Sequence, residues 1–165
     1  MNTPYVSGNP LARLARESLS TWLSRQPWDL FVTLTDPGMS HPEAMSKRHR
    51  YLAHRVNDHL YGRHWDKRTD GIEWVSGIER QARGSVHIHA LWRFPDHDPA
   101  DPIIFLRRHW QDKADALGGF SRIEPVRNQT DVVDYVTKYV LKDGDIDLAP
   151  GFDPNNPRVR TEVTL

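Results

Sequence analysis

The chain has 165 residues, of which 38% are hydrophobic and six are tryptophan, and this composition suits one globular domain with a buried core. The absence of cysteine excludes disulfides and thiolate zinc sites. No apolar run of membrane-spanning length and no signal-peptide pattern occurs, so we expect a soluble, cytoplasmic protein. The formal net charge is zero, but residues 143–165 carry −3 and residues 1–142 therefore carry +3, a mild basic bias compatible with a phosphate-binding surface.

The chain opens with the patterns of a helix and a strand. Asn9-Pro10 predicts the start of a helix over about residues 10–25, with a stripe of residues at helical spacing: Leu11, Leu14, Ala15, Ser18, Leu19 and Trp22. Residues 29–35 alternate as a strand does, and one of its faces carries Phe31, Thr33 and Thr35.

A second helix follows, with Ser40 placed as a capping residue three positions before Glu43 and an end at Gly62. Its apolar stripe contains Met45, Leu52, Val56 and Leu60. The helix also carries His49, His54 and His59. These histidines share no metal-ligand spacing, and we interpret them as surface or partly packed residues.

Two strand patterns, residues 72–80 and 84–92, are joined by a short turn and predict a β-hairpin. Placing Glu79 opposite His87 gives one face an almost wholly apolar set of cross-strand pairs, as a core requires. The same register puts His87 and His89 on the other face, with Gly77 leaving space opposite His89. One register therefore satisfies both faces.

Two imidazoles and a carboxylate on one rigid surface can form a mixed nitrogen and oxygen site for a divalent ion, open on the side that faces away from the sheet. The alternative is a pair of hydrogen-bonded histidines beside a surface carboxylate. Because the chain has nine histidines, a His-x-His sequence arises easily by chance, and the hairpin alone does not decide between the two.

Residues 98–119 predict a further helix, residues 120–126 a fourth strand, and residues 130–142 a final helix. The order predicts an α+β fold: a ferredoxin-like or RNA-recognition-like split βαββαβ antiparallel sheet with packed helices, plus the N-terminal helix and the final helix. We assign residues 1–142 to one domain. Residues 143–165 form an acidic C-terminal tail that contains Pro and Asn and that we expect to be disordered.

The final helix displays tyrosines beside lysines, because Tyr135, Lys138, Tyr139 and Lys142 lie at i, i+3, i+4 and i+7. A separate apolar arc contains Val132, Val133, Val136 and Val140, so the helix can dock by its valines. In helical projection Tyr135 lies among the lysines, whereas Tyr139 lies next to the valines. Two half-buried structural tyrosines are the alternative interpretation.

The strand of residues 29–35, the hairpin and the final helix together resemble the HUH endonuclease superfamily, specifically the rolling-circle replication initiator (Rep) proteins of phages and plasmids. Phe31-Val32-Thr33-Leu34-Thr35 is similar to the family's first motif, and His87-Ile88-His89 to its name-giving pair. Residues 135–142 resemble its tyrosine motif in the version with two tyrosines one turn apart. Glu79 stands where the family has its third metal ligand, and the resemblance spans about residues 28–142.

The resemblance implies metal-dependent nicking of single-stranded DNA at a replication origin, and strand transfer through a 5′-phosphotyrosyl intermediate. It implies that Tyr135 and Tyr139 are nucleophiles and that Lys138 stabilises the phenolate or its product. It further implies Mg²⁺ or Mn²⁺ held by His87, His89 and Glu79. The sequence has no phosphate-binding Gly-rich loop of the kind found in helicases, so a separate helicase is the expected partner.

Two other functions stay open. A non-catalytic module for single-stranded nucleic acid would stack bases on aromatic residues of the sheet, and it would need neither the histidine pair nor Tyr135. A transposase or relaxase relative within the same superfamily is the second, although two tyrosines within one turn are more typical of the replication initiators.

Overall fold

The structure, a computed structural model, describes residues 10–36, 41–82, 84–95, 112, 120–143 and 146–153. Its elements in chain order are α1 (Pro10–Leu23), β1 (Leu30–Asp36), α2 (Pro42–Tyr61), the 3₁₀ turn η1 (Trp65–Lys67), β2 (Glu73–Arg80), β3 (Val86–Arg93), β4 (Phe120–Pro125), α4 (Gln129–Asp143) and β5 (Ile146–Leu148). The strands form one antiparallel sheet in the order β4-β1-β3-β2-β5. The predicted α+β class is confirmed, and the sheet is consistent with a ferredoxin-like split fold.

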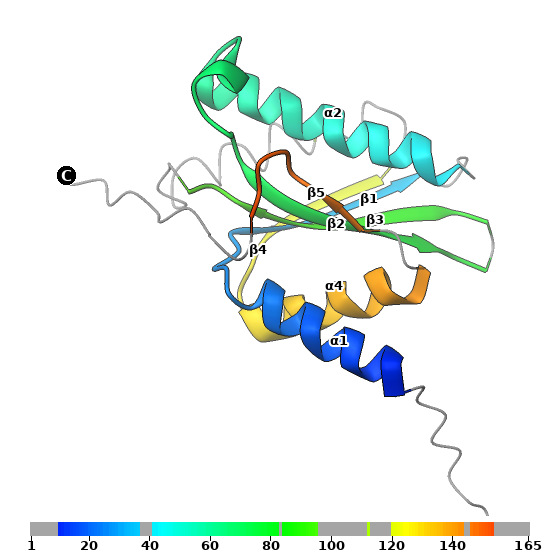
Figure 1. The fold of residues 1–165 in the computed structure, drawn as a ribbon. Helices are drawn as coiled ribbons and strands as arrows, with labels where there is room; N and C mark the ends of the chain where they lie inside the picture. Colours follow the sequence, from blue (N-terminus) through cyan, green and yellow to red (C-terminus); the bar gives the residue numbers. More distant parts are fainter. Residues whose placement is uncertain are drawn as a thin grey trace, which may run out of the picture.

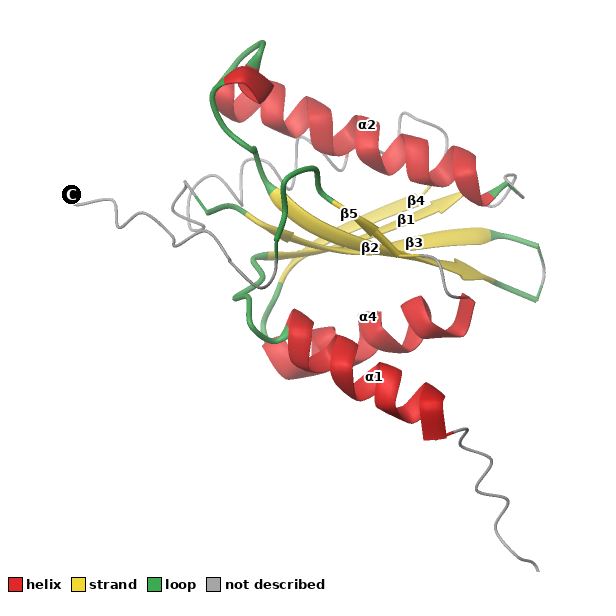
Figure 2. Cartoon of the chain, in the orientation of Figure 1, coloured by secondary structure: helices red, strands yellow, loops and turns green. Residues whose placement is uncertain are grey.

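Helices cover both faces of this sheet, with α2 on one side and α1 and α4 side by side on the other (Figures 1 and 2). Met45, Leu52 and Val56 of α2 belong to the larger core, together with the alternate strand residues that face them. The smaller core lies under α4, where Val133 and Val136 pack with Val75 and Leu91 of the sheet. The predicted valine docking of the final helix is therefore confirmed for these two valines.

The hairpin of β2 and β3 has the register that the sequence predicts, from Glu73 opposite Arg93 through Gly77 opposite His89 to Glu79 opposite His87. Its turn is closed by two main-chain hydrogen bonds, from the Gln81 N–H to the Ser85 carbonyl at 3.0 Å and from the Gly84 N–H to the Gln81 carbonyl at 2.9 Å. Gly84 has φ of 86°, a conformation that glycine adopts without steric cost.

Strand β1 lies between β3 and β4, and its odd-numbered residues share the α4 face with the two histidines. Thr33 lies opposite His89 on one side and Arg122 on the other. Thr35 lies opposite His87. The alternation of β1 is visible in the sequence, but its neighbours are long-range contacts that only the fold establishes.

Helix α2 differs from its prediction in two respects. The N-cap is His41 and not Ser40, because Pro42 at the first helical turn forces the residue before it into the extended conformation observed, φ −101° and ψ 112°. His49 is fully buried, whereas His54 and His59 are exposed. Its position fits the stripe of Met45, Leu52 and Val56, so the expectation of a surface or partly packed His49 is wrong.

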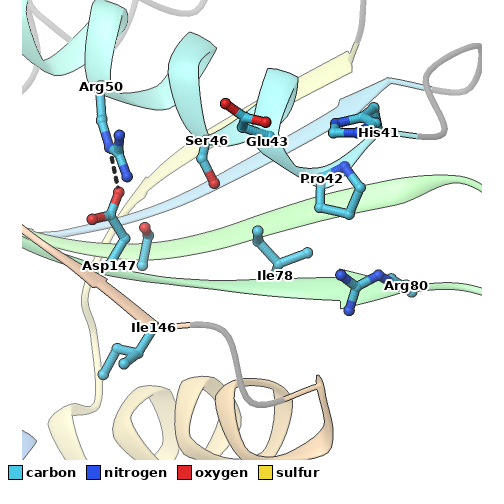
Figure 3. A pocket seen from close by; sticks show the side chains of 10 residues that line it. His41, Pro42, Glu43, Ser46, Arg50, Ile78, Arg80, Ile146 and Asp147 are labelled. Carbon is cyan, nitrogen blue, oxygen red and sulfur yellow. Dashed lines mark hydrogen bonds and ion pairs between the residues drawn. The ribbon is translucent and has the colours of Figure 1, made fainter.

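The expectation of a disordered end is also wrong for residues 146–153. Strand β5 pairs with β2, which would otherwise be an edge strand, and Ala149 is buried behind it. Arg50 of α2 holds the strand through an ion pair of 2.6 Å between its Nε and the Asp147 carboxylate (Figure 3). Packing on the sheet has overridden a weak local signal.

Helix α1 packs against α4 only through its second half, where Leu23 is buried and Leu19 and Trp22 are partly buried. Leu11 and Leu14 are exposed, so the predicted apolar stripe is only partly used. The helix predicted over residues 98–119 lies, apart from Asp112, outside the described residues, as do the side chains of Val140 and Lys142.

Candidate metal centre

Glu79, His87 and His89 converge on the α4 face of the hairpin. Each of the three offers a ligand atom, and these atoms all lie within 4.8 Å of one another. The Oε2 atom of Glu79 is 3.1 Å from Nε2 of His89, so the carboxylate reaches diagonally across the strands and not to the histidine directly opposite. The predicted convergence is therefore present, and the cluster can hold a metal ion.

Two threonines of β1 contact the other nitrogen of each imidazole. Thr33 Oγ1 is 3.3 Å from Nδ1 of His89, and Thr35 Oγ1 is 3.4 Å from Nδ1 of His87. A histidine that donates its Nδ1–H to a hydroxyl oxygen keeps the lone pair of Nε2 free for a ligand. The two threonines thus favour the tautomer and the ring orientation that a metal site requires.

Burial also favours the ligand form of His89, whose side chain is only 3% exposed. Burial lowers the pKa of His89 below its ordinary value, although the hydrogen bond and the charge of Glu79 act in the opposite direction. The imidazole is therefore neutral near pH 7. Two neutral imidazoles and one carboxylate form a donor set that fits a divalent ion such as Mg²⁺ or Mn²⁺.

The two tyrosines of α4 lie directly over this cluster. Their ring centroids are 5.3 Å (Tyr135) and 4.7 Å (Tyr139) from that of His89, and 4.6 Å from each other. Because the valines of α4 dock on Val75 and Leu91, the helix covers His89. The expectation of a site open on the side away from the sheet is thus wrong at this histidine, whereas His87 stays partly exposed.

The surroundings of the two phenols differ. Tyr135 is 40% exposed and Tyr139 is partly buried, as the helical projection predicts. Lys138 Nζ lies 5.6 Å from the ring centroid of Tyr139, so proximity to a lysine does not single out Tyr135. Partial burial first, and then the hydrogen bond to Tyr139, raise the pKa of Tyr135 above its ordinary value. Both the phenol of Tyr135 and the cluster beneath it are arranged for chemistry with an added cation.

Sequence reasoning had no role for the threonine hydroxyls or for the Phe31 ring. Phe31 lies nearly parallel to His89, with ring centroids 6.0 Å apart and an interplanar angle of 7°, and it meets Tyr135 edge to face at 5.5 Å. The alternation of residues 29–35 already placed these three side chains on one face. What was missing was that this face adjoins the histidines.

The opposite face of the sheet has a hollow of about 520 Å³ between α2 and β5, lined among others by His41, Ser46, Arg50, Arg80 and Asp147 (Figure 3). None of the residues predicted for chemistry contributes to it. The hollow also contains the Arg50–Asp147 ion pair that ties β5 to α2. We assign it a structural role.

The model of a replication-associated protein family, the ORF2 type, matches residues 29–144, more than half of the chain. The match includes the metal cluster, both tyrosines and all of β1. Comparisons with curated proteins and with solved structures find no match. Among the helices of the described residues, none is long and apolar enough to cross a membrane.

Proposed function

Because the chain belongs to the ORF2-type family of replication-associated proteins, we propose that it is an HUH-type endonuclease that nicks single-stranded DNA at a replication origin. One observation carries the proposal: two tyrosine rings lie within 5.3 Å of the ring of a histidine that shares a cluster with a second histidine and a carboxylate. A module that only binds nucleic acid needs no such combination. A separate helicase would supply the unwinding.

The reaction we propose exchanges one phosphodiester for another. The phenolic oxygen of a tyrosine bonds to the scissile phosphorus while the bond from phosphorus to the 3′ oxygen breaks. The phenol loses its proton, and the leaving 3′ oxygen takes one up. The products are a 5′-phosphotyrosyl protein and a free 3′-hydroxyl, and the bond retained in the protein can later be attacked to rejoin a strand.

Each group of the cluster has a defined part in this scheme. A Mg²⁺ or Mn²⁺ ion bound by Glu79, His87 and His89 would polarise the scissile phosphate. The hairpin fixes the positions of these three side chains, and Thr33 orients the ring of His89. Lys138, exposed on α4, would stabilise negative charge on a phenolate or on the phosphotyrosyl product.

We propose Tyr135 as the first nucleophile. It is the more exposed of the two phenols, and it lines a groove beside the cluster that a DNA strand can reach. Tyr139, partly buried against His89, would act in a second transfer. This order follows from access, since both rings contact the same histidine.

The test is the formation of a covalent adduct. The protein is incubated with single-stranded origin-region DNA and Mn²⁺, and a denaturing gel is examined for a protein–DNA band that disappears with chelator. Tyr135→Phe should abolish the first cleavage, whereas Tyr51→Phe, which alters an exposed tyrosine of α2, should form the adduct as the wild type does. Adduct formation in chelator, or none at all by the wild type, would refute the proposed mechanism.

A further inference from the structure

A groove of about 600 Å³ runs beside the cluster, between β4 and the start of α4. Phe31 and Tyr135 line it on the side of the metal cluster, and Arg122, Glu124, Arg127 and Asp131 line the rest. Strand β4 leads directly into α4 here (Figure 1). Its volume falls in the range of small-molecule sites, and one nucleotide is a molecule of that class.

The sheet register places the groove in line with the candidate chemistry. On the α4 face, Arg122 lies opposite Thr33, and Thr33 lies opposite His89. Two strand spacings separate Arg122 from His89, or about 10 Å between their Cα atoms. A strand of DNA with one phosphate at the cluster would therefore have its neighbouring nucleotide over β1 and β4.

The walls of the groove have the two chemistries that a nucleotide requires. Phe31 and Tyr135 offer aromatic surface, on which bases of any sequence can stack. Arg127, exposed between β4 and α4, forms no ion pair with a described residue and is therefore able to contact a phosphate. The Arg122–Glu124 ion pair is exposed on both sides, at 73% and 44%, and such pairs yield readily to a competing anion.

The loop that carries Arg127 is held in place at both ends. The Val126 N–H donates to the Asp29 carbonyl at 2.9 Å. Gln129 is joined to Trp28 by two hydrogen bonds, one of 2.9 Å from the Trp28 N–H to Gln129 Oε1 and one of 2.7 Å from Gln129 Nε2 to the Trp28 carbonyl. A groove wall fixed in this way loses little entropy when a ligand binds.

From these contacts we infer that the groove between β4 and α4 binds the nucleotide next to the scissile phosphate, with its base on Phe31 and a phosphate on Arg127. This inference rests on the proposed function for the position of the scissile phosphate. Glu124 and Asp131 are the negative groups of the groove, so the strand is expected to place base edges, which include hydrogen-bond donors, on that side.

Binding without cleavage tests the phosphate contact. Fluorescence anisotropy with a labelled single strand of mixed sequence, about 20 nucleotides long and in chelator, gives the affinity between about 50 and 200 mM NaCl. Arg127→Ala should weaken binding about fivefold at the lower salt and should make the slope of log K against log salt shallower by about 0.7, the value for one phosphate contact to a single strand. The matched control is Arg63→Ala after α2, which removes the same charge. Equal affinity and slope in the two variants would overturn the inference.

The base contact is tested with Phe31→Leu and two probes. On the ordinary strand this variant should bind about fivefold more weakly or worse, because stacking is lost. On a strand of abasic nucleotides it should bind as the wild type does, since no base is left to stack. An equal loss on both probes would show general damage and would overturn the base assignment.

The two proposals fail separately. If the wild type forms the covalent adduct but Arg127→Ala binds as well as Arg63→Ala, the nuclease assignment stands and the groove does not. If no adduct forms but both groove variants weaken binding as expected, the groove stands as a single-strand site and the nuclease assignment falls.

Discussion

His49 makes the stability of the fold depend on pH in a way that can be calculated. The side chain is fully buried in the larger core, its ring meets the Trp74 ring edge to face, and its Nε2 accepts a hydrogen bond of 3.0 Å from the Trp92 indole N–H. Burial lowers the pKa of His49 from 6.5 to about 4, with the Asp147 charge acting in the opposite direction and Arg50 adding to the shift. Protonation of Nε2 would also remove the acceptor of the indole N–H.

The sign follows from the order of the two pKa values. Between about pH 4 and 6.5 the unfolded chain binds a proton at His49 that the folded chain does not, so acid favours unfolding. The stabilisation is fully present above pH 6.5 and is lost as the pH falls toward 4. Between about pH 7.5 and 5.0 the loss amounts to about 2 kcal/mol.

We expect His49→Gln to abolish this increment, because the Gln amide oxygen can accept from the Trp92 indole but does not titrate. Urea unfolding at about pH 7.5 and 5.0, followed by tryptophan fluorescence, measures it. With m of about 2 kcal/mol per molar urea, the midpoint of the wild type should fall by about 1 M more than that of the variant.

His59→Gln is the matched control, because it removes an exposed histidine from the same helix. It should lose as much stability on acidification as the wild type. The reasoning would be refuted if His49→Gln lost the same stability as the wild type between the two pH values, since every other titrating group is common to both proteins.

Three further outcomes follow from the site. Thr33→Val should weaken Mn²⁺ binding, measured by calorimetry, about tenfold through the lost orientation of its histidine, whereas Thr137→Val, whose buried hydroxyl has no hydrogen-bond partner among the described residues, should not. Mass spectrometry of the DNA-linked peptide should find DNA on Tyr135, and Tyr139→Phe should permit the first cleavage but impair a second transfer; DNA on Tyr139 alone would reverse the proposed order. Arg93→Met should destabilise the fold by about 3–5 kcal/mol in urea, because it leaves the carboxylate of a buried 2.6 Å ion pair without its partner; a cost below about 1 kcal/mol would contradict this.

The sequence by itself determined the hairpin and the docking face of the tyrosine helix. The hairpin register could be predicted because a short turn links its strands, and because a slip of one residue would move every apolar side chain to the wrong face. The face of α4 could be predicted because Val133 and Val136 are spaced for burial and Tyr135 is not. Both are local patterns of period two or 3.6.

The tertiary structure alone decided what lies around those elements. No tight turn joins β1 to β3, so the sequence could not place Thr33 beside His89. Strand β5 has three residues and no periodic signal, and it forms because β2 offers unpaired main-chain groups and Arg50 a charge. His49 is buried because its partners, the indoles of Trp74 and Trp92, come from strands far along the chain. Contacts between distant segments depend on which faces meet, and local periodicity does not contain that information.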